Sequence, residues 1–136
     1  MAIYYVDFEN VHIGGLKGAE NLDSDDTILI FCRENDVEKI KNECKRREIK
    51  AYTKCCVVSS TTKNALDFEL ISELFMEKCD EIRYIISHDK GFEAAVERGL
   101  RKGLLCFRKE SINDTGFLHE LDFYKSSCRE VVINTI

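Results

Sequence analysis

Apolar side chains recur every three or four residues in residues 37–46, 64–78 and 91–102, which is typical of amphipathic helices. Apolar, strand-like segments lie between and around them, at residues 3–6, 27–32, 82–87 and 104–107, and a longer, more mixed one covers residues 49–59. In these segments β-branched and aromatic residues follow one another without regular polar positions. That pattern is typical of strands buried on both faces of a parallel sheet.

The alternation of strands and helices with short connections predicts an α/β fold. We expect a three-layer sandwich with one mainly parallel sheet of about five strands, helices on both of its faces, and right-handed crossovers. Residues 118–123 are a candidate for a last short helix. Residues 130–136 are a candidate for a final strand at an edge of the sheet or at a subunit contact.

Length and composition fit one soluble domain that spans residues 1–136. A chain of 136 residues is long enough to bury a core without disulfides or metal ions. The hydrophobic fraction of 44% is that of a globular protein, and no apolar run approaches the ~20 residues that cross a membrane. The first residues lack the basic region of a signal peptide, so we expect a cytoplasmic protein without a membrane partner.

Cysteine content and net charge each argue against a class of function. The seven cysteines include no CxxC pair. Zinc sites and redox motifs require close pairs, so we interpret the cysteines as reduced and mostly buried thiols. The formal net charge of −5 argues against a broad basic platform for duplex DNA. It is compatible with a nuclease, because metal-binding carboxylates themselves add negative charge.

Two aspartates follow predicted strands at the carboxyl ends, where open α/β sheets bind their ligands. Asp7 ends the first apolar run, and Asp89 follows the fourth. If the strand order is 3-2-1-4-5, the first and fourth strands are neighbours, and Asp7 and Asp89 lie side by side. Taken alone, an aspartate after a strand is equally well explained as a turn or helix-cap residue.

A third aspartate, Asp67, lies on the predicted helix of residues 64–78. At ~100° per residue, Asp67 falls within the apolar stripe that packs on the sheet. That stripe contains Leu70, Ile71, Leu74 and Phe75. A carboxylate there is costly unless it is paired or binds a metal ion, although its place in the first helical turn lowers the cost. Glu69 points nearly opposite, toward water.

Three carboxylates in one crevice repel one another. Protonation, basic neighbours or a hard cation can relieve that repulsion, and Mg²⁺ or Mn²⁺ fits oxygen ligands best. Such a site activates water and stabilises the negative charge that builds up on a phosphate during displacement. The three aspartates together therefore favour a metal-dependent phosphodiesterase over three unrelated turn or helix residues.

Three motifs occur in order along most of the chain. They are Asp7-Phe8-Glu9-Asn10 after the first strand, Asn64-Ala65-Leu66-Asp67 on the helix, and Ser87-His88-Asp89-Lys90-Gly91-Phe92-Glu93 after the fourth strand. Their order and placement resemble the NYN branch of PIN-like nuclease domains. The resemblance implies the strand order 3-2-1-4-5 and metal-dependent cleavage of single-stranded or structured RNA. It also makes a homodimer possible, because dimers are common among PIN-like proteins.

The same resemblance implies a role for individual residues. Asp7, Asp67 and Asp89 would be ligands of Mg²⁺ or Mn²⁺. Asn10 would orient a ligand or a phosphate, and Glu93 would be a fourth acid outside the inner coordination sphere. Many members of the family have aspartate at that last position, and glutamate is longer.

Other polar residues near these motifs are candidates for contact with substrate. They are Lys54, Lys63, Lys90 and the hydroxyl groups of residues 59–62, although each lysine is also explained as a solvated surface charge. The glycine-rich residues 14–18 lack the spacing of a nucleotide-binding loop, and we interpret them as a flexible loop near the site. We expect the side chain of His88 to face solvent.

Other acidic α/β proteins fit the sequence less well. A receiver domain needs a phospho-acceptor aspartate at the end of the third strand, where this chain has Val57-Val58-Ser59. A haloacid-dehalogenase-like phosphatase uses a D-x-D pair, which Asp7-Phe8-Glu9 approaches without an evident downstream lysine and acid. The remaining alternative is a catalytically inactive PIN-like domain that binds RNA or docks another protein.

Overall fold

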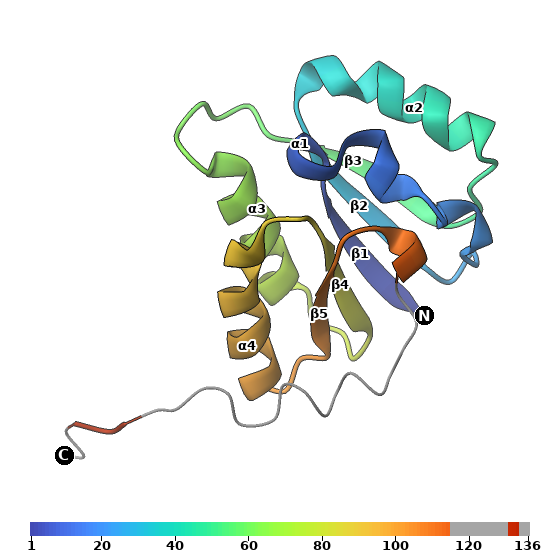
Figure 1. Cartoon of the computed structure of the whole chain (residues 1–136). Helices are drawn as coiled ribbons and strands as arrows, with labels where there is room; N and C mark the ends of the chain where they lie inside the picture. Colours follow the sequence, from blue (N-terminus) through green and yellow to red (C-terminus); the bar gives the residue numbers. More distant parts are fainter. Residues whose placement is uncertain (115–130, 134–136) are drawn as a thin grey trace.

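The central sheet has five parallel strands in the order β3-β2-β1-β4-β5. They are β1 (Ala2–Asp7), β2 (Thr27–Cys32), β3 (Tyr52–Val57), β4 (Ile82–Ile86) and β5 (Cys106–Lys109). The structure is a computed structural model that describes residues 1–114 and 131–133. It confirms the predicted α/β class and strand order, with β1 and β4 as neighbours (Figure 1).

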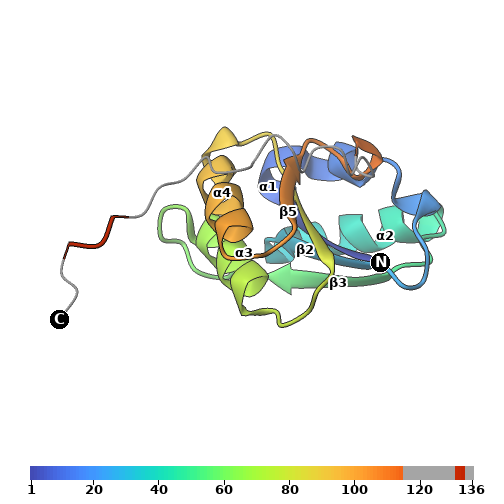
Figure 2. The same ribbon diagram turned by 90° about the horizontal axis from the view of Figure 1, so that it is seen from below.

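Helices cover both faces of the sheet and complete three layers (Figure 2). On one face lie α1 (Phe8–Val11) and α2 (Val37–Arg46), and on the other lie α3 (Ala65–Met76) and α4 (Glu93–Arg101). Short 3-10 helices form many of the connections: η1 (His12–Leu16), η2 (Ala19–Asn21), η3 (Glu34–Asp36), η4 (Lys90–Phe92) and η5 (Ile112–Asp114).

Each face of the sheet has its own apolar cluster. Val6 of β1 belongs to the cluster that contains Ile40 of α2, whereas Tyr5, one residue earlier, packs with Leu70 and Leu74 of α3. All of β1 is buried, which explains why its sequence is a continuous apolar run. Because burying one large apolar side chain contributes roughly 1.5–3 kcal/mol, this packing fixes the carboxyl end of β1 in the middle of the molecule.

Two strands begin later than predicted, because the preceding helices end in hydrogen-bonded caps. After α4, Gly103 has a left-handed backbone (φ 89°), and the Leu104 N–H donates to the Gly99 carbonyl oxygen at 2.9 Å. Glu48 (φ 52°) and Ile49 repeat the arrangement after α2. These are Schellman caps, which place the next residues in a connection. The predicted strands 49–59 and 104–107 are therefore corrected to β3 and β5.

The two elements predicted near the carboxyl terminus have different outcomes. The helix expected at residues 118–123 lies outside the described residues. Of residues 130–136, only 131–133 are described, and they form no strand and are exposed. Among the helices of the described ranges, none is long and apolar enough to cross a membrane.

Residues 14–18 form an ordered turn, which corrects the prediction of a flexible loop. Gly15 and Leu16 of η1 are buried, and a Cβ on Gly15 would collide with the Val11 side chain. Gly18 has a left-handed backbone (φ 96°), and a Cβ there would lie 2.7 Å from the Asn113 Cα. The sequence shows the glycines but not these neighbours, which come from α1 and η5.

We predict that Gly18→Ala destabilises the protein, whereas Gly14→Ala does not. The first change forces a left-handed backbone and a collision with Asn113, and we expect a loss of more than ~1 kcal/mol in the free energy of unfolding. A Cβ on Gly14 would have no atom within 4 Å, so it is the matched control. Urea unfolding of both variants tests this, and equal stabilities would mean that the segment is not ordered in this way.

Candidate active site

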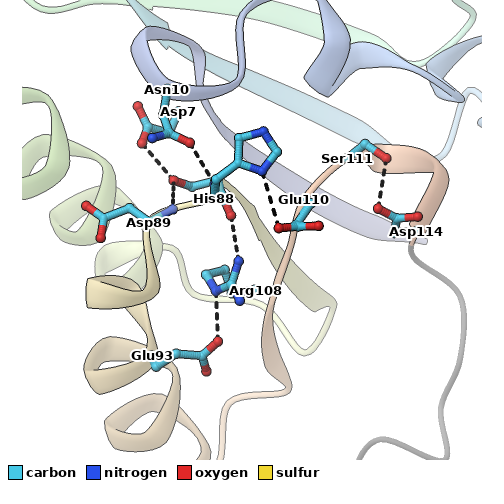
Figure 3. A network of polar contacts seen from close by, with 10 residues as sticks. Asp7, Asn10, His88, Asp89, Glu93, Arg108, Glu110, Ser111 and Asp114 are labelled. Atoms are coloured by element: carbon cyan, nitrogen blue, oxygen red, sulfur yellow. Dashed lines mark hydrogen bonds and ion pairs between the residues drawn. The ribbon is translucent and has the colours of Figure 1, made fainter.

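The two strand-end aspartates are joined through one serine. Asp7 is the last residue of β1 and only 3% exposed, and Ser87 directly follows β4 on the neighbouring strand. The Ser87 hydroxyl donates to Asp7 Oδ2 at 2.9 Å and accepts from the Asp89 N–H at 3.0 Å (Figure 3). Asp89 Oδ1 in turn accepts from the Gly91 N–H at 2.8 Å. Ser87 therefore sets the geometry of both acids, a role that the sequence analysis did not assign.

Asn10 connects α1 to the same turn. Its Oδ1 accepts a hydrogen bond from the His88 N–H at 2.7 Å. The side chain of His88 is exposed, as expected, and its Nδ1 lies 3.5 Å from Glu110 Oε1. In this structure Asn10 thus positions the loop that carries Asp89.

Asp67 lies in the first turn of α3 and at the margin of its buried face. Leu66, Leu70 and Leu74 are buried along that face, whereas Asp67 is half-buried and Glu69 is exposed. The observed buried stripe of α3 therefore lies one position nearer the amino terminus than the predicted stripe. This small rotation leaves Asp67 between the core and solvent, where its carboxylate can reach a ligand.

The three aspartates interact electrostatically. Burial raises the pKa of Asp7 to about 6, and the charge of Asp67 adds to this rise while the hydrogen bond from Ser87 opposes it. Burial also raises the pKa of Asp67, and the charges of Asp89 and Glu9 raise it further. Burial is the larger cause of both shifts, and the smaller contribution from neighbouring carboxylates is the repulsion that a bound cation would relieve.

A pocket of about 270 Å³ opens beside these acids, between α3 and the turn after β4. Its lining combines Asp67 and Asp89 with one amide and several apolar side chains: Asn64, Phe68, Ile71 and Phe92, with Gly91 completing the wall. Two of the predicted site residues thus face one cavity.

The structure places Glu93 in an ion pair. Glu93 Oε1 lies 2.8 Å from Arg108 Nε of β5, and Arg108 Nη1 donates to the Ser87 carbonyl oxygen at 2.8 Å (Figure 3). Glu93 does not line the pocket. It is therefore linked to the turn that carries Asp89 through Arg108 and the Ser87 carbonyl oxygen, and no sequence pattern identified Arg108.

A second arginine holds the loop that leads into α3. Arg33 Nε lies 2.9 Å from Glu9 Oε1, while Arg33 Nη1 donates to the carbonyl oxygens of Val58 and Ser60 at 3.0 and 2.6 Å. Arg33 follows β2, so this contact ties the ends of three strands together. The lysines singled out from the sequence, Lys54, Lys63 and Lys90, are exposed.

A family model for the PIN domain matches residues 1–109, from the first residue to the end of β5. The chain belongs to the PIN domain family. Comparisons with curated proteins and with solved structures gave no significant match. PIN domains are generally nucleases that use divalent metal ions, and they typically act on RNA.

Of the acidic side chains around the site of this PIN domain, some have an arginine partner and others do not. The two outer acids, Glu9 and Glu93, are each paired with an arginine. Within the described part of the chain, the three inner acids, Asp7, Asp67 and Asp89, have no ion pair. Oxygen donors without a cationic partner suit a hard divalent cation.

The donor chemistry therefore fits Mg²⁺ or Mn²⁺, but the ligands are not yet assembled. Among residues 1–114 and 131–133, no three acidic, histidine or cysteine side chains stand in the arrangement of a ready metal site. Holding one ion with all three aspartates requires side-chain movement.

We predict that Asp7→Asn makes the metal-free protein more stable near neutral pH. The folded protein favours the protonated form of Asp7, so ionising this carboxyl lowers the free energy of unfolding. This loss is absent below the ordinary pKa of 3.8 and complete above about 6. At about 1.4 kcal/mol per pKa unit, the gain at pH 7 is at most roughly 3 kcal/mol. Asparagine can still accept the hydrogen bond from Ser87.

Unfolding of both proteins in EDTA between pH 4 and pH 8 checks this. The stability difference should shrink as the pH falls through the folded pKa. A difference that stays constant with pH would contradict the assigned cause.

Proposed function

We propose that this PIN domain is a divalent-metal-dependent endoribonuclease that hydrolyses phosphodiester bonds in single-stranded or structured RNA. The observation that carries the proposal is the set of three interacting aspartates, free of arginine partners in the described chain, at the carboxyl ends of β1 and β4 and on α3. A nuclease family and an acidic cluster beside a pocket point to the same chemistry.

Asp7, Asp67 and Asp89 are the residues that would hold Mg²⁺ or Mn²⁺. When bound, the cation supplies an activated water and neutralises charge on the phosphate. Ser87 keeps Asp7 oriented, and the Gly91 N–H fixes one oxygen of Asp89. Asn10 holds the loop after β4, and Glu93 acts outside the inner sphere through Arg108.

The order of the three motifs further supports assignment to the NYN branch. Asp7 and Asn10 lie at the end of β1 and on α1, Asp67 on α3, and Ser87 and Asp89 after β4. This is the placement that the resemblance implies. We therefore carry the branch assignment forward as part of the proposed function.

The second candidate is a PIN domain without catalysis that binds RNA or docks another protein. The ion pair between Glu93 and Arg108 favours it, because the fourth acid is already engaged. Titration with Mn²⁺ separates the two candidates. A domain without a metal site shows no saturable rise in melting temperature, whereas a specific site stabilises the folded state by mass action.

The purified protein should cleave a single-stranded RNA oligonucleotide in Mn²⁺ and lose this activity in EDTA. Duplex DNA in the same buffer should be cut more slowly, because the chain has a net charge of −5 and no broad basic surface is expected. Asp89→Asn should lower the rate by more than the ~10- to 100-fold typical of losing an outer-sphere partner. Wild-type rates for this variant, or faster cleavage of duplex DNA, would refute the proposal.

Asp67 and Glu69 offer a matched pair of acids on one helix. They are separated by ~200° of helical rotation, and only Asp67 lines the pocket. We predict that Asp67→Ala abolishes cleavage and weakens Mn²⁺ binding, whereas Glu69→Ala changes neither, since an exposed charge contributes little. Calorimetry with Mn²⁺ and RNA cleavage rates on both variants decide this. Equal losses would indicate a diffuse acidic surface instead of a site.

A further inference from the structure

The pocket beside Asp67 and Asp89 has an apolar wall that metal binding does not explain. Phe68 and Ile71 of α3 and Phe92 of η4 line it. Phe92 is buried in the core, but Phe68 is 64% exposed. An exposed aromatic ring contributes little to folding, and here it borders a cavity that also contains the candidate catalytic acids.

An amide side chain lies at the same pocket. Asn64 precedes α3 with a left-handed backbone (φ 62°), and its side chain makes no capping hydrogen bond to the helix. It lines the cavity with Phe68. An amide has both donors and an acceptor, which can pair with the polar edge of a ligand while an aromatic ring contacts its flat face.

We infer that this pocket binds one unpaired nucleobase of the RNA, with Phe68 as the stacking surface and Asn64 as the partner of the base edge. This role rests on the proposed nuclease function and adds the way in which the substrate is selected. A neutral, flat base suits the apolar wall, whereas a phosphate without a cation would be repelled by Asp67 and Asp89.

The size of the pocket supports a single base. Its volume of about 270 Å³ lies just below the ~300–1,000 Å³ of sites that hold drug-sized ligands. A paired base is stacked inside a duplex, where an aromatic side chain cannot reach its face. The pocket therefore selects single-stranded RNA or an unpaired loop, and it positions the neighbouring phosphate near the acids.

The test uses nucleosides, which carry no phosphate and therefore do not depend on the metal site or on cleavage. Adenosine, guanosine, cytidine and uridine are titrated to millimolar concentration into the full chain, and the aromatic resonances are followed by NMR. We expect at least one nucleoside to shift the ring signals of Phe68 and Phe92. In Phe68→Ala the shift of Phe92 should disappear, whereas Phe68→Tyr, which keeps a stacking ring, should retain it.

Tyr52→Ala is the matched control. Tyr52 is 61% exposed, close to the 64% of Phe68, but it lies at the amino end of β3, whereas the acids lie at the carboxyl end of the sheet. Its removal should leave nucleoside binding and RNA cleavage unchanged. Phe68→Ala should lower kcat/KM for RNA roughly 5- to 150-fold, which corresponds to the ~1–3 kcal/mol of one base stacked on an aromatic side chain. With the wild-type protein, an RNA that has an abasic nucleotide at the position entering the pocket should show the same loss in kcat/KM. Phe68→Ala should cleave the abasic and the intact RNA equally well.

The outcomes separate this inference from the proposed function. Nucleoside-induced shifts without RNA cleavage would support the base-binding pocket and contradict the proposed nuclease activity. Cleavage that is unaffected by Phe68→Ala, together with no shift from any nucleoside, would keep the nuclease and overturn the pocket. Loss of self-association in Phe68→Ala without any nucleoside effect would identify Phe68 as a protein contact and also overturn it.

Discussion

The hydrogen bond from Ser87 to Asp7 is the interaction on which the polar end of the sheet depends. Asp7 is buried because β1 is the central strand, and a buried carboxylate is costly unless a donor stabilises it. Ser87 supplies that donor from the adjacent strand. The same hydroxyl accepts from Asp89, and the Ser87 carbonyl accepts from Arg108. One residue thus links the position of β1 to the turn after β4 and to β5.

The packing of α3 on the sheet also determines where Asp67 lies. Leu66, Leu70 and Leu74 fix the rotation of α3 against the sheet, and this rotation puts Asp67 at the edge of the buried face. Arg33 holds the preceding loop by its contacts with backbone carbonyls. The backbone that carries the acids is therefore held by regular elements on both sides, whereas the acid side chains must still move before all three can hold one ion.

The strand order came from the resemblance to PIN-like nuclease domains. Local patterns predicted the α/β class and located Asp7, Asp67 and Asp89, because strand ends and helical periodicity can be read from neighbouring residues. They did not predict the partners of those acids. Arg33 follows β2 and Arg108 lies in β5, and nothing in their own segments marks them as contacts of the site. The glycine turn was missed for the same reason, since Gly18 packs against the distant Asn113. The Schellman caps are local: Gly103 is a signal for one of them, whereas Glu48 carries no such signal for the other.

The positions of the arginines determine which acids at the carboxyl end of the sheet have a cationic partner and which do not. If every acid there had an arginine partner, the cluster would be a set of structural ion pairs and a cation would have nothing to neutralise. Instead Glu9 and Glu93 each have an arginine partner at the periphery, whereas within the described residues the three inner aspartates have no ion pair and burial raises the pKa of Asp7 and Asp67. Unpaired, partly buried carboxylates lower stability, and in the proposed function a bound cation would offset that cost. In this arrangement the outer ion pairs orient the loops, and the inner carboxylates remain available to a ligand.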